Sequence, residues 1–482
     1  MHDLVVIGDD LSSYIAAAVG VKFGLKTLHI VEHSLKEMSL SDIFFNADPS
    51  PVTGFGDGQS VISLFKELGI KIEKDDLFHL SPAYQIILPE QRVDFAPQQE
   101  DVLADLIREF PHKAKRIKSF YKSVRKNSDF LEKWISAHPF FRVNSFKQYF
   151  NYFKLFIKLI TFDWRINKFR RVLLDDSSLR KIYEAQLAFL SADNAAAESL
   201  SSFYHFSTPW RGTFGFPKGK TYLMESLRNF FENSGGIYKS DCRLSSIRKS
   251  HCLDAEIMDE RGLTSQISAK NIVISHKSEA LNVFYKKKKK INTTKWLQRF
   301  KTTHYPLTLH FVISEKSLPE KMARHVLLVS DTNKHIFDDN LIILDVNNPD
   351  MEKRSTQGRK LVAATVFLSA DKDDWQREKL LVAAEKTIAR LENFLPFLKD
   401  NVKFYDINKS IDISTKYRNV ANAKYKVKKA LFSGFSAQKN KTSLRGVYLC
   451  GAALFTDMGC FEGEIISGMY AVYSVLKPRK KP

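Results

Sequence analysis

The chain has 482 residues and a formal net charge of +20. Hydrophobic residues make up 44% of the sequence and charged residues 27%, which is ordinary for a globular protein and excludes a disordered chain. The length predicts two domains rather than one core, and the charge predicts an anionic partner such as an acidic membrane face, nucleic acid or an acidic protein.

The four cysteines show no CxxC pair and no metal-ligand spacing: Cys242, Cys252, Cys450 and Cys460. We therefore expect reduced thiols and no metal site. The N-terminus has no basic segment before its first apolar run, and no stretch approaches the roughly 18 uninterrupted apolar residues of a membrane span. These features predict a cytoplasmic protein, either soluble or peripheral on the inner membrane face.

The first predicted unit runs from Asp3 to Glu32 and has the pattern of a nucleotide-binding βαβ unit. Leu4–Ile7 is a short apolar run typical of a buried parallel strand, and Tyr14–Val21 predicts a tightly packed helix. Thr27–Val31 predicts the second strand. Glu32 follows it, where such folds place an acid that binds a ribose hydroxyl.

The GxGxxG fingerprint of such units should begin at Gly8, but Asp10 stands at the second glycine and Ser13 at the third. The second glycine lets the backbone approach a pyrophosphate, and the third lets helix and strand pack closely. Ser13 is a small change. A carboxylate about 4 Å from a phosphate charge costs roughly 4 kcal/mol at an effective dielectric of about 20. The sequence therefore predicts the βαβ scaffold, but it does not decide whether a nucleotide cofactor binds.

The segment Phe140–Arg171 carries eight basic residues, eleven aromatic residues and a single acid. On a helical wheel its aromatic face lies beside a stripe of Lys147, Lys154, Lys158 and Arg165. This pattern is typical of a helix in a membrane interface; a core helix with exposed lysines and the wall of an apolar substrate tunnel are alternatives. Single-strand binders also interleave basic and aromatic residues, but no nucleic-acid motif accompanies them here, so a membrane surface is favoured over nucleic acid.

The rest of the chain continues with alternating strands and helices. Amphipathic helices are predicted over Tyr222–Phe231 and Trp375–Phe397. Strands are predicted at Leu244–Arg248, Ala255–Met258, Asn271–Ser275, His304–Ser314 and Leu361–Ala370. The chain closes with a strand, a glycine-rich loop and a helix.

Four motifs in order carry a family resemblance. They are the N-terminal βαβ unit, the PKG triplet Pro217–Gly219 before a helix, the three strands ending at Ser275, and the spacing of Gly451, Gly459, Gly463, Ser467 and Gly468. The chain thus resembles the FAD-dependent phytoene desaturase and retinol saturase branch of the amine-oxidase-like flavoproteins. The resemblance implies that glycines at that spacing let a loop pass under the isoalloxazine ring and begin a helix aimed at it.

The resemblance implies an α/β fold in which a Rossmann-like domain, with a parallel sheet and a β-meander, is interleaved with an α+β substrate domain. The FAD-binding domain would comprise residues 1–75, 205–285 and 440–482, and the substrate- and membrane-facing domain residues 76–204 and 286–439. The implied FAD site consists of Gly8, Asp10, Leu11, Ser12, Ser13, Glu32, Leu244, Gly451, Ala452, Gly459, Phe461, Glu462 and Gly463.

The sequence also departs from the family pattern, beginning with Asp10 and Ser13. The RxGGR-type segment is missing, because Lys36–Ser41 reads KEMSLS. Ala452 replaces the acid that usually follows the C-terminal strand's glycine, and Glu462 puts a negative charge near a reduced flavin. Together these departures indicate altered, weakened or lost FAD binding.

Two functional hypotheses follow. In the first, the protein is an FAD-dependent oxidoreductase that transfers hydride between flavin and a long apolar, isoprenoid or lipid-like substrate. That chemistry demands no side-chain base, so no catalytic residue is predicted; Tyr204, His205 and His304 are polar aromatic residues that are common in cores and on surfaces. In the second, the protein is a relative without the cofactor that binds a lipid or a protein, as the Rab GDP-dissociation inhibitors hold prenylated proteins without FAD.

Overall fold

The structure is a computed structural model of the whole chain. It describes residues 1–34, 39–40, 43–44, 48, 50–73, 75–137, 175–193, 201–216, 219–249, 252–281, 283, 300–347, 358–396, 398–418, 420–427 and 440–476. The segment Phe140–Arg171 and the first two residues of the PKG triplet lie outside this set. The membrane-facing helix therefore stays a prediction.

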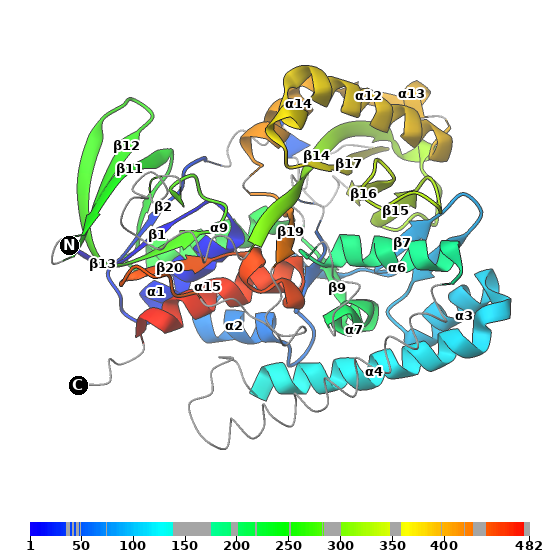
Figure 1. Cartoon of the computed structure of the whole chain (residues 1–482), viewed down its shortest axis with the longest axis horizontal. Helices are drawn as coiled ribbons and strands as arrows, with labels where there is room; N and C mark the ends of the chain where they lie inside the picture. Colours follow the sequence, from blue (N-terminus) through cyan, green and yellow to red (C-terminus); the bar gives the residue numbers. More distant parts are fainter. Residues whose placement is uncertain are drawn as a thin grey trace.

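Within the described residues, one of two large sheets has seven strands and forms the left part of Figure 1. Strands β10, β2, β1, β13 and β20 run parallel in that order, and β12 and β11 extend β13 as an antiparallel meander. The strand bounds are β1 His2–Ile7, β2 Thr27–Ile30, β10 Ile237–Lys239, β11 Cys242–Lys249, β12 Leu253–Asp259, β13 Thr264–Ser275 and β20 Val447–Cys450. This arrangement confirms the predicted Rossmann-like fold class.

Helix α1 (Leu11–Lys22) is the central helix of this first sheet and packs against α15 (Cys460–Leu476) and α9 (Lys220–Asn233). Its first ten residues are buried, because the sheet covers one side of the helix and the other two helices cover the rest. The crossing with α15 is close: a Cβ at Gly468 would lie 2.2 Å from the carbonyl oxygen of Ser12. Glycine is therefore required there. Helix α2 (Ser60–Leu68) lies beside them.

The second large sheet, on the right of Figure 1, has eight strands among the described residues. Its order is β18, β14, β17, β16, β15, β7 and β8, with β19 also paired to β14. The bounds are β7 Tyr84–Ile87, β8 Arg92–Phe95, β14 Phe300–Ser314, β15 His325–Val329, β16 Leu341–Asn347, β17 Arg359–Ser369, β18 Val402–Tyr405 and β19 Lys424–Val427.

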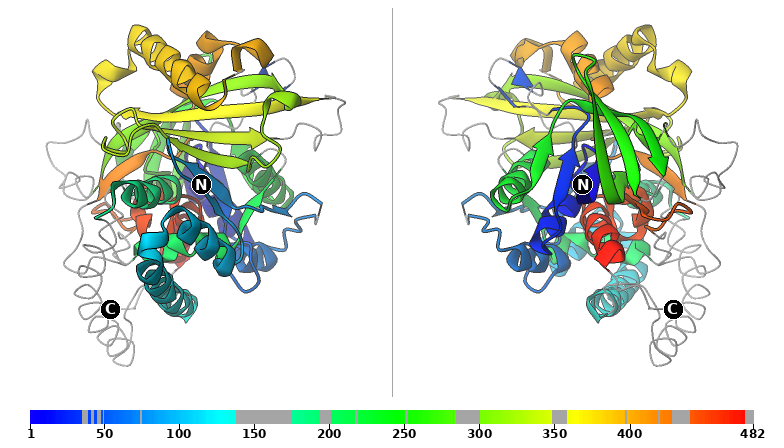
Figure 2. Two further views of the ribbon diagram at one scale, coloured as in Figure 1. Left: turned by 90° about the vertical axis from the view of Figure 1, so that its right-hand side faces the viewer. Right: turned by 90° about the vertical axis from the view of Figure 1, so that its left-hand side faces the viewer.

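Three helices cover one face of the second sheet: α12 (Arg377–Phe394), α13 (Leu398–Asn401) and α14 (Ile407–Lys416). The two side views of Figure 2 show them as a separate layer over the strands. Helix α12 is amphipathic and buries Leu380, Ala384 and Leu391 against the sheet. Helix α6 (Ser177–Leu190) contacts β7 and β15.

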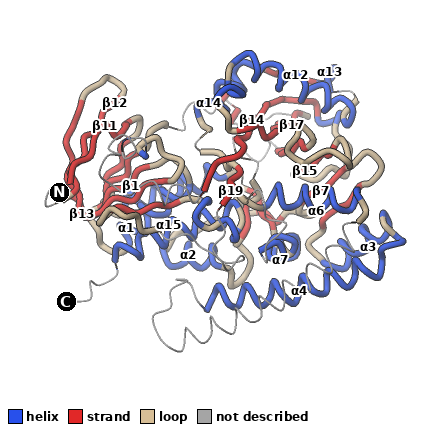
Figure 3. Tube along the Cα trace, in the orientation of Figure 1, coloured by secondary structure: helices blue, strands red, loops and turns tan. Residues whose placement is uncertain are grey.

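Smaller elements connect the two sheets. They are β3 (Ser39–Leu40), β4 (Ile43–Phe44), β5 (Val52–Thr53), β6 (Phe78–His79), β9 (Thr213–Gly215), α3 (Gln99–Glu109), α4 (Ala114–Ala137), α7 (Ser201–Phe206) and α8 (Thr208–Arg211). Figure 3 shows α4 running along the lower edge of the molecule. Aromatic side chains join these helices, since the Phe120 ring meets Tyr183 at 5.1 Å and Phe206 at 5.5 Å between centroids.

Most elements predicted outside the βαβ unit are present. The strands are somewhat longer than predicted, and α12 is shorter than predicted. The strand predicted at Asn271–Ser275 belongs to β13, and the strand predicted at His304–Ser314 is β14. Helix α12 begins two residues later than predicted, because residues 372–375 form a 3₁₀ turn. No helix in the described part of the chain is both long and apolar enough to cross a membrane.

Candidate functional site

The candidate site lies where β1, β13 and β20 end together. The strand register sets Ile7 beside Ile274 and Ile274 beside Leu449, so the turns after the three strands meet at one edge. In open parallel sheets, ligands bind outside the carboxyl ends of the strands. The turn after β1 begins at Gly8, whose φ is +147° and whose added Cβ would lie 2.5 Å from the Ser275 Cβ.

Asp10 is fully buried and caps α1. Its carboxylate accepts hydrogen bonds from the Ser12 hydroxyl at 2.9 Å and from the Ser13 backbone N–H at 3.4 Å. The Ser13 hydroxyl donates to the Gly8 carbonyl at 2.8 Å, and Leu11 is buried behind them. The N-terminus of such a helix is where a dinucleotide-binding fold places the pyrophosphate. Here a carboxylate of the chain itself occupies that position.

The surroundings of Asp10 shift the pKa of its carboxyl group. Burial raises the pKa of Asp10 to about 6, although the opposite charge of Lys277 acts in the other direction. The carboxyl group is therefore mainly ionised at neutral pH. A negative group lies at the helix N-terminus.

Glu32, the predicted ribose ligand, is bound to the chain's own backbone. Its two carboxylate oxygens accept the N–H groups of Glu279 and Ala280, each at 3.0 Å. Asp9 accepts the Glu32 backbone N–H at 2.6 Å and lies 2.9 Å from the Nδ1 atom of His33. Burial, together with the negative charge of Asp9, raises the pKa of Glu32 to about 7.

His276 covers Gly451, the first residue after β20. Gly451 has a φ of +125°, and a Cβ there would lie 1.7 Å from the His276 Nδ1 atom. The ring lies 3.2 Å from the Cys450 carbonyl oxygen and packs on Tyr425 with 5.1 Å between centroids. Burial lowers the pKa of His276 to about 3, so the imidazole is neutral. Ala452 follows Gly451 and is fully buried.

A buried set of ion pairs, here called the central charge network, consists of Asp48, Lys220, Lys277 and Glu464. The Glu464 carboxylate lies 2.8 Å from Lys277 Nζ and 3.3 Å from Lys220 Nζ, and Lys220 Nζ lies 2.6 Å from Asp48 Oδ2. No side chain of the network is more than 7% exposed. The network ties α9 and α15 to the turn after β13.

Glu462, which the sequence placed where it would oppose a reduced flavin, has a cationic partner. Its carboxylate lies 3.1 Å from Arg211 Nη2 and accepts the Tyr204 hydroxyl at 2.7 Å. The guanidinium also stacks on the Tyr204 ring, 3.5 Å from its centroid. This negative charge is therefore neutralised within the fold.

The remaining predicted site residues are packed against the chain itself. Phe461 is buried against Phe55, with 6.1 Å between ring centroids, and Leu244 is buried in β11. A Cβ at Gly459 would lie 3.2 Å from the Leu190 carbonyl oxygen, and one at Gly463 2.7 Å from the carbonyl oxygen of Phe455. These glycines serve close packing of α15.

The central charge network, Arg211 and His276 were not predicted from the sequence. His276 and Lys277 are the first two residues after the strand predicted at Asn271–Ser275, which is the one signal that could have placed them at the edge of the sheet. Among the described residues, no cluster of three or more His, Cys, Asp or Glu side chains could hold a metal ion, and all four cysteines are free thiols.

These residues do not fit the pyrophosphate and ribose of FAD. Three positions where a dinucleotide would contact the sheet edge hold the chain's own groups: the Asp10 carboxylate at the helix N-terminus, the Glu32 carboxylate on backbone N–H groups, and the His276 ring over the glycine after β20. The backbone N–H groups of Ser13, Glu279 and Ala280 are therefore already bonded within the chain. No catalytic step through a flavin follows from this geometry.

The sequence matches no protein-family model, and no curated protein is similar to it in sequence. Among solved structures, an oxidoreductase from Methanosarcina mazei is similar with a TM-score of 0.61 and 12% identity over 98% of this chain and 100% of that chain. A triple mutant of putrescine oxidase gives 0.61 and 12% over 98% of both chains. Rab GDI from Plasmodium falciparum gives 0.54 and 9% over 98% of both. The chain thus has the fold of FAD-binding oxidoreductases.

Proposed function

We propose that this chain is a non-redox binding protein built on the fold of FAD-dependent oxidoreductases, in which the dinucleotide cleft has become part of the core. The observation that carries the proposal is the Asp10 carboxylate at the N-terminus of α1. It accepts the Ser13 N–H group and lies at the favourable end of the helix dipole, where a pyrophosphate would bind.

Charge repulsion also disfavours a pyrophosphate at this position. A phosphate placed about 4 Å from the Asp10 carboxylate would be repelled by roughly 4 kcal/mol at an effective dielectric of about 20. Lys277, the nearby cation, is already paired with Glu464 at 2.8 Å. Moving Lys277 to a phosphate would break this pair and leave the buried Glu464 with only the longer contact to Lys220, at 3.3 Å.

The proposed partner is a lipid or a protein, as in the second hypothesis from the sequence. The likeness in fold to Rab GDI supports a binding role by analogy, since a fold hosts many functions and the site decides among them. The positive net charge supports an acidic or anionic partner.

The test is the flavin content of the purified protein, followed by calorimetric titration with FAD. We expect a protein without visible flavin absorption and no heat of binding with FAD. The variant Asp10→Gly is the matched comparison, because it removes the charge at the helix N-terminus. Glu32 still binds the backbone N–H groups and His276 still covers Gly451, so we expect this variant to bind FAD weakly or not at all. A yellow wild-type protein with one FAD per chain would overturn the proposal.

A second candidate is the flavoenzyme that the resemblance implies, a phytoene desaturase-like oxidoreductase acting on a long isoprenoid or lipid-like chain. The observation that favours it is the C-terminal loop, because Gly451 and Gly459 have positive φ values of +125° and +85°. The same experiment separates the two candidates. The enzyme would be supported by bound flavin that reacts with such a substrate. The more saturated chain would reduce the oxidised flavin, or the polyene would oxidise the reduced flavin.

A further inference from the structure

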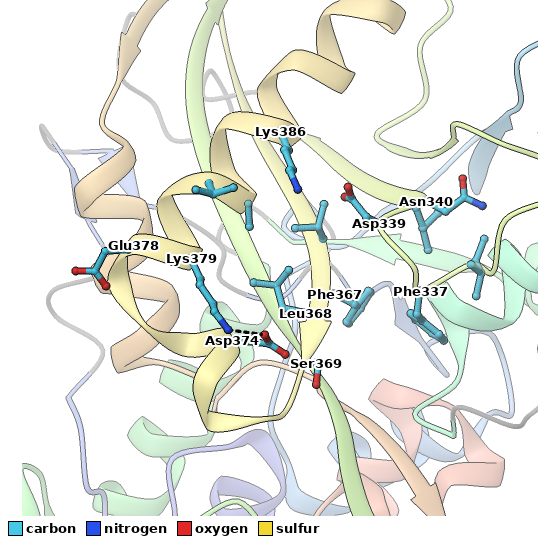
Figure 4. Close-up of a pocket in the computed structure, with 15 residues that line it drawn as sticks. Phe337, Asp339, Asn340, Phe367, Leu368, Ser369, Asp374, Glu378, Lys379 and Lys386 are labelled. Atoms are coloured by element: carbon cyan, nitrogen blue, oxygen red, sulfur yellow. Dashed lines mark hydrogen bonds and ion pairs between the residues drawn. The ribbon is translucent and has the colours of Figure 1, made fainter.

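A pocket outside the candidate site opens between α12 and the end of β17. Its volume is about 480 Å³, within the roughly 300–1,000 Å³ typical of small-molecule sites. Figure 4 shows α12 along one side, β17 behind, and the loop that carries Phe337 and Asp339 on the other side. Its floor is apolar, formed by Phe337, Val366, Phe367 and Leu368.

An exposed apolar side chain belongs to the same pocket. Val382 of α12 lines it and is 50% exposed, one of few large hydrophobic residues with that much exposure in the described chain. A ligand chain lying on the floor would cover this side chain. Exposed apolar surface beside a concave apolar floor favours an apolar ligand group.

In the part of the chain that the structure describes, one cation faces the pocket without an acid beside it. Arg390 Nη1 lies 2.6 Å from Asp339 Oδ1, and Lys379 Nζ lies 3.4 Å from Asp374 Oδ1, so these two acids have partners. Glu378, the third acid that lines the pocket, points away from it in Figure 4. Lys386 has no ion-pair partner among the described residues, and its ammonium group reaches over the pocket in Figure 4.

We propose that this pocket binds a medium-chain fatty acid, with the alkyl chain on the apolar floor and the carboxylate at Lys386. One unpaired cation that faces the pocket matches one negative charge on the ligand. A phosphate dianion would bring a second charge near Asp339 and Asp374, and a neutral alkyl chain would leave Lys386 unused. The proposal does not depend on the dinucleotide cleft, because the pocket lies on the second sheet.

The first experiment compares ligands by calorimetry on the full chain: decanoate, octanoate and decan-1-ol, each below its micelle concentration. We expect decanoate to bind one per chain. Decan-1-ol should bind about fivefold more weakly, because it lacks the carboxylate that pairs with Lys386. A partly exposed ion pair contributes about 1 kcal/mol, which corresponds to this factor. Octanoate should bind roughly tenfold more weakly, because each buried methylene contributes up to about fourfold.

The second experiment uses variants. Lys386→Ala should weaken decanoate about fivefold and leave decan-1-ol unchanged. Lys403→Ala removes the same charge from an exposed position of β18 outside the pocket, and it should change neither. Ala383→Phe fills the pocket and should abolish binding of both ligands. Equal affinity of decanoate and decan-1-ol, unchanged binding by Ala383→Phe, or no binding by wild type would each overturn the proposal, whatever the FAD titration shows.

Discussion

The carboxylate of Glu464 lies 2.8 Å from the ammonium group of Lys277, with both side chains buried, and this pair joins α15 to the turn after β13. A buried pair contributes little net stability compared with apolar residues of the same size, because both charges lose their water. Once it is present, however, removing Lys277 would leave the buried Glu464 with only the longer contact to Lys220, at 3.3 Å, and removing Glu464 would leave the buried Lys277 without its partner.

Single neutralising substitutions in this pair should therefore be strongly destabilising. Lys277→Met and Glu464→Gln should each lower the free energy of unfolding by about 3–5 kcal/mol. The double variant should lose clearly less than the sum, because no unpaired charge remains between these two positions. Urea unfolding of the four proteins measures this coupling, and additive losses would contradict a direct pair.

Stability should depend on pH through Glu32. The pKa of Glu32 is about 7 in the folded protein and 4.5 as its ordinary value, so the folded state holds the proton more tightly. Its contribution to stability is present below about pH 4.5 and is lost as the pH rises to about 7. The full shift corresponds to roughly 3 kcal/mol.

The measurement compares wild type with Glu32→Gln by urea unfolding between about pH 4.5 and about pH 7. We expect the glutamine variant to gain stability relative to wild type as the pH rises. Glu260→Gln, at an exposed position in the turn after β12, is the matched control and should show a constant difference. A constant difference for Glu32→Gln as well would refute the raised pKa.

Two arginines allow a comparison of buried and exposed ion pairs. Arg211 pairs with Glu462 at 3.1 Å with side chains 7% and 2% exposed, whereas Arg377 pairs with Asp412 at 2.8 Å with side chains 51% and 58% exposed. Arg211→Met should lower the free energy of unfolding by about 3–5 kcal/mol, and Arg377→Met by less than about 1 kcal/mol. Thermal and urea unfolding would show this; similar losses at both positions would count against the neutralising role of Arg211.

The basic aromatic segment Phe140–Arg171 stays a prediction from the sequence. Each lysine near an anionic leaflet contributes about 1 kcal/mol, so the stripe of Lys147, Lys154, Lys158 and Arg165 should give salt-sensitive binding to anionic liposomes. Glutamate at all four positions should abolish that part of the binding, measured by co-sedimentation with anionic and neutral lipids. If both proteins sediment equally, the aromatic residues serve the core or a substrate tunnel instead.

The fold could be predicted because its strands have local signatures. Leu4–Ile7 and Asn271–Ser275 are short apolar runs beside turn residues, and a buried parallel strand requires little else. The position of Glu32 at the end of β2 was predictable for the same reason. That its carboxylate binds the backbone of Glu279 and Ala280 was not, because that turn lies 247 and 248 residues away in the chain.

The central charge network was unpredictable for a physical reason. Lys277 and Glu464 are 187 residues apart, and Lys220 and Glu464 are 244 apart. A charged residue in a sequence is normally solvated, and only the tertiary packing removes its water. The position of His276 after a predicted strand indicates the edge of the sheet, but a glycine pattern does not reveal which side chain covers the glycine.

The late position of β20 in the sequence determines when the first sheet can be completed. Its partner β13 is complete at Ser275, but β20 begins at Val447, so the ribosome must add more than one hundred and seventy residues before β13 gains this neighbour. Until then the edge of β13 at residues 272–275 is open to pairing with other chains, because β12 covers only the part before it. Because α15 follows β20, its Glu464 reaches Lys220 and Lys277 only after β20 has been made. This domain should therefore depend on chaperones more than a domain with contiguous strands.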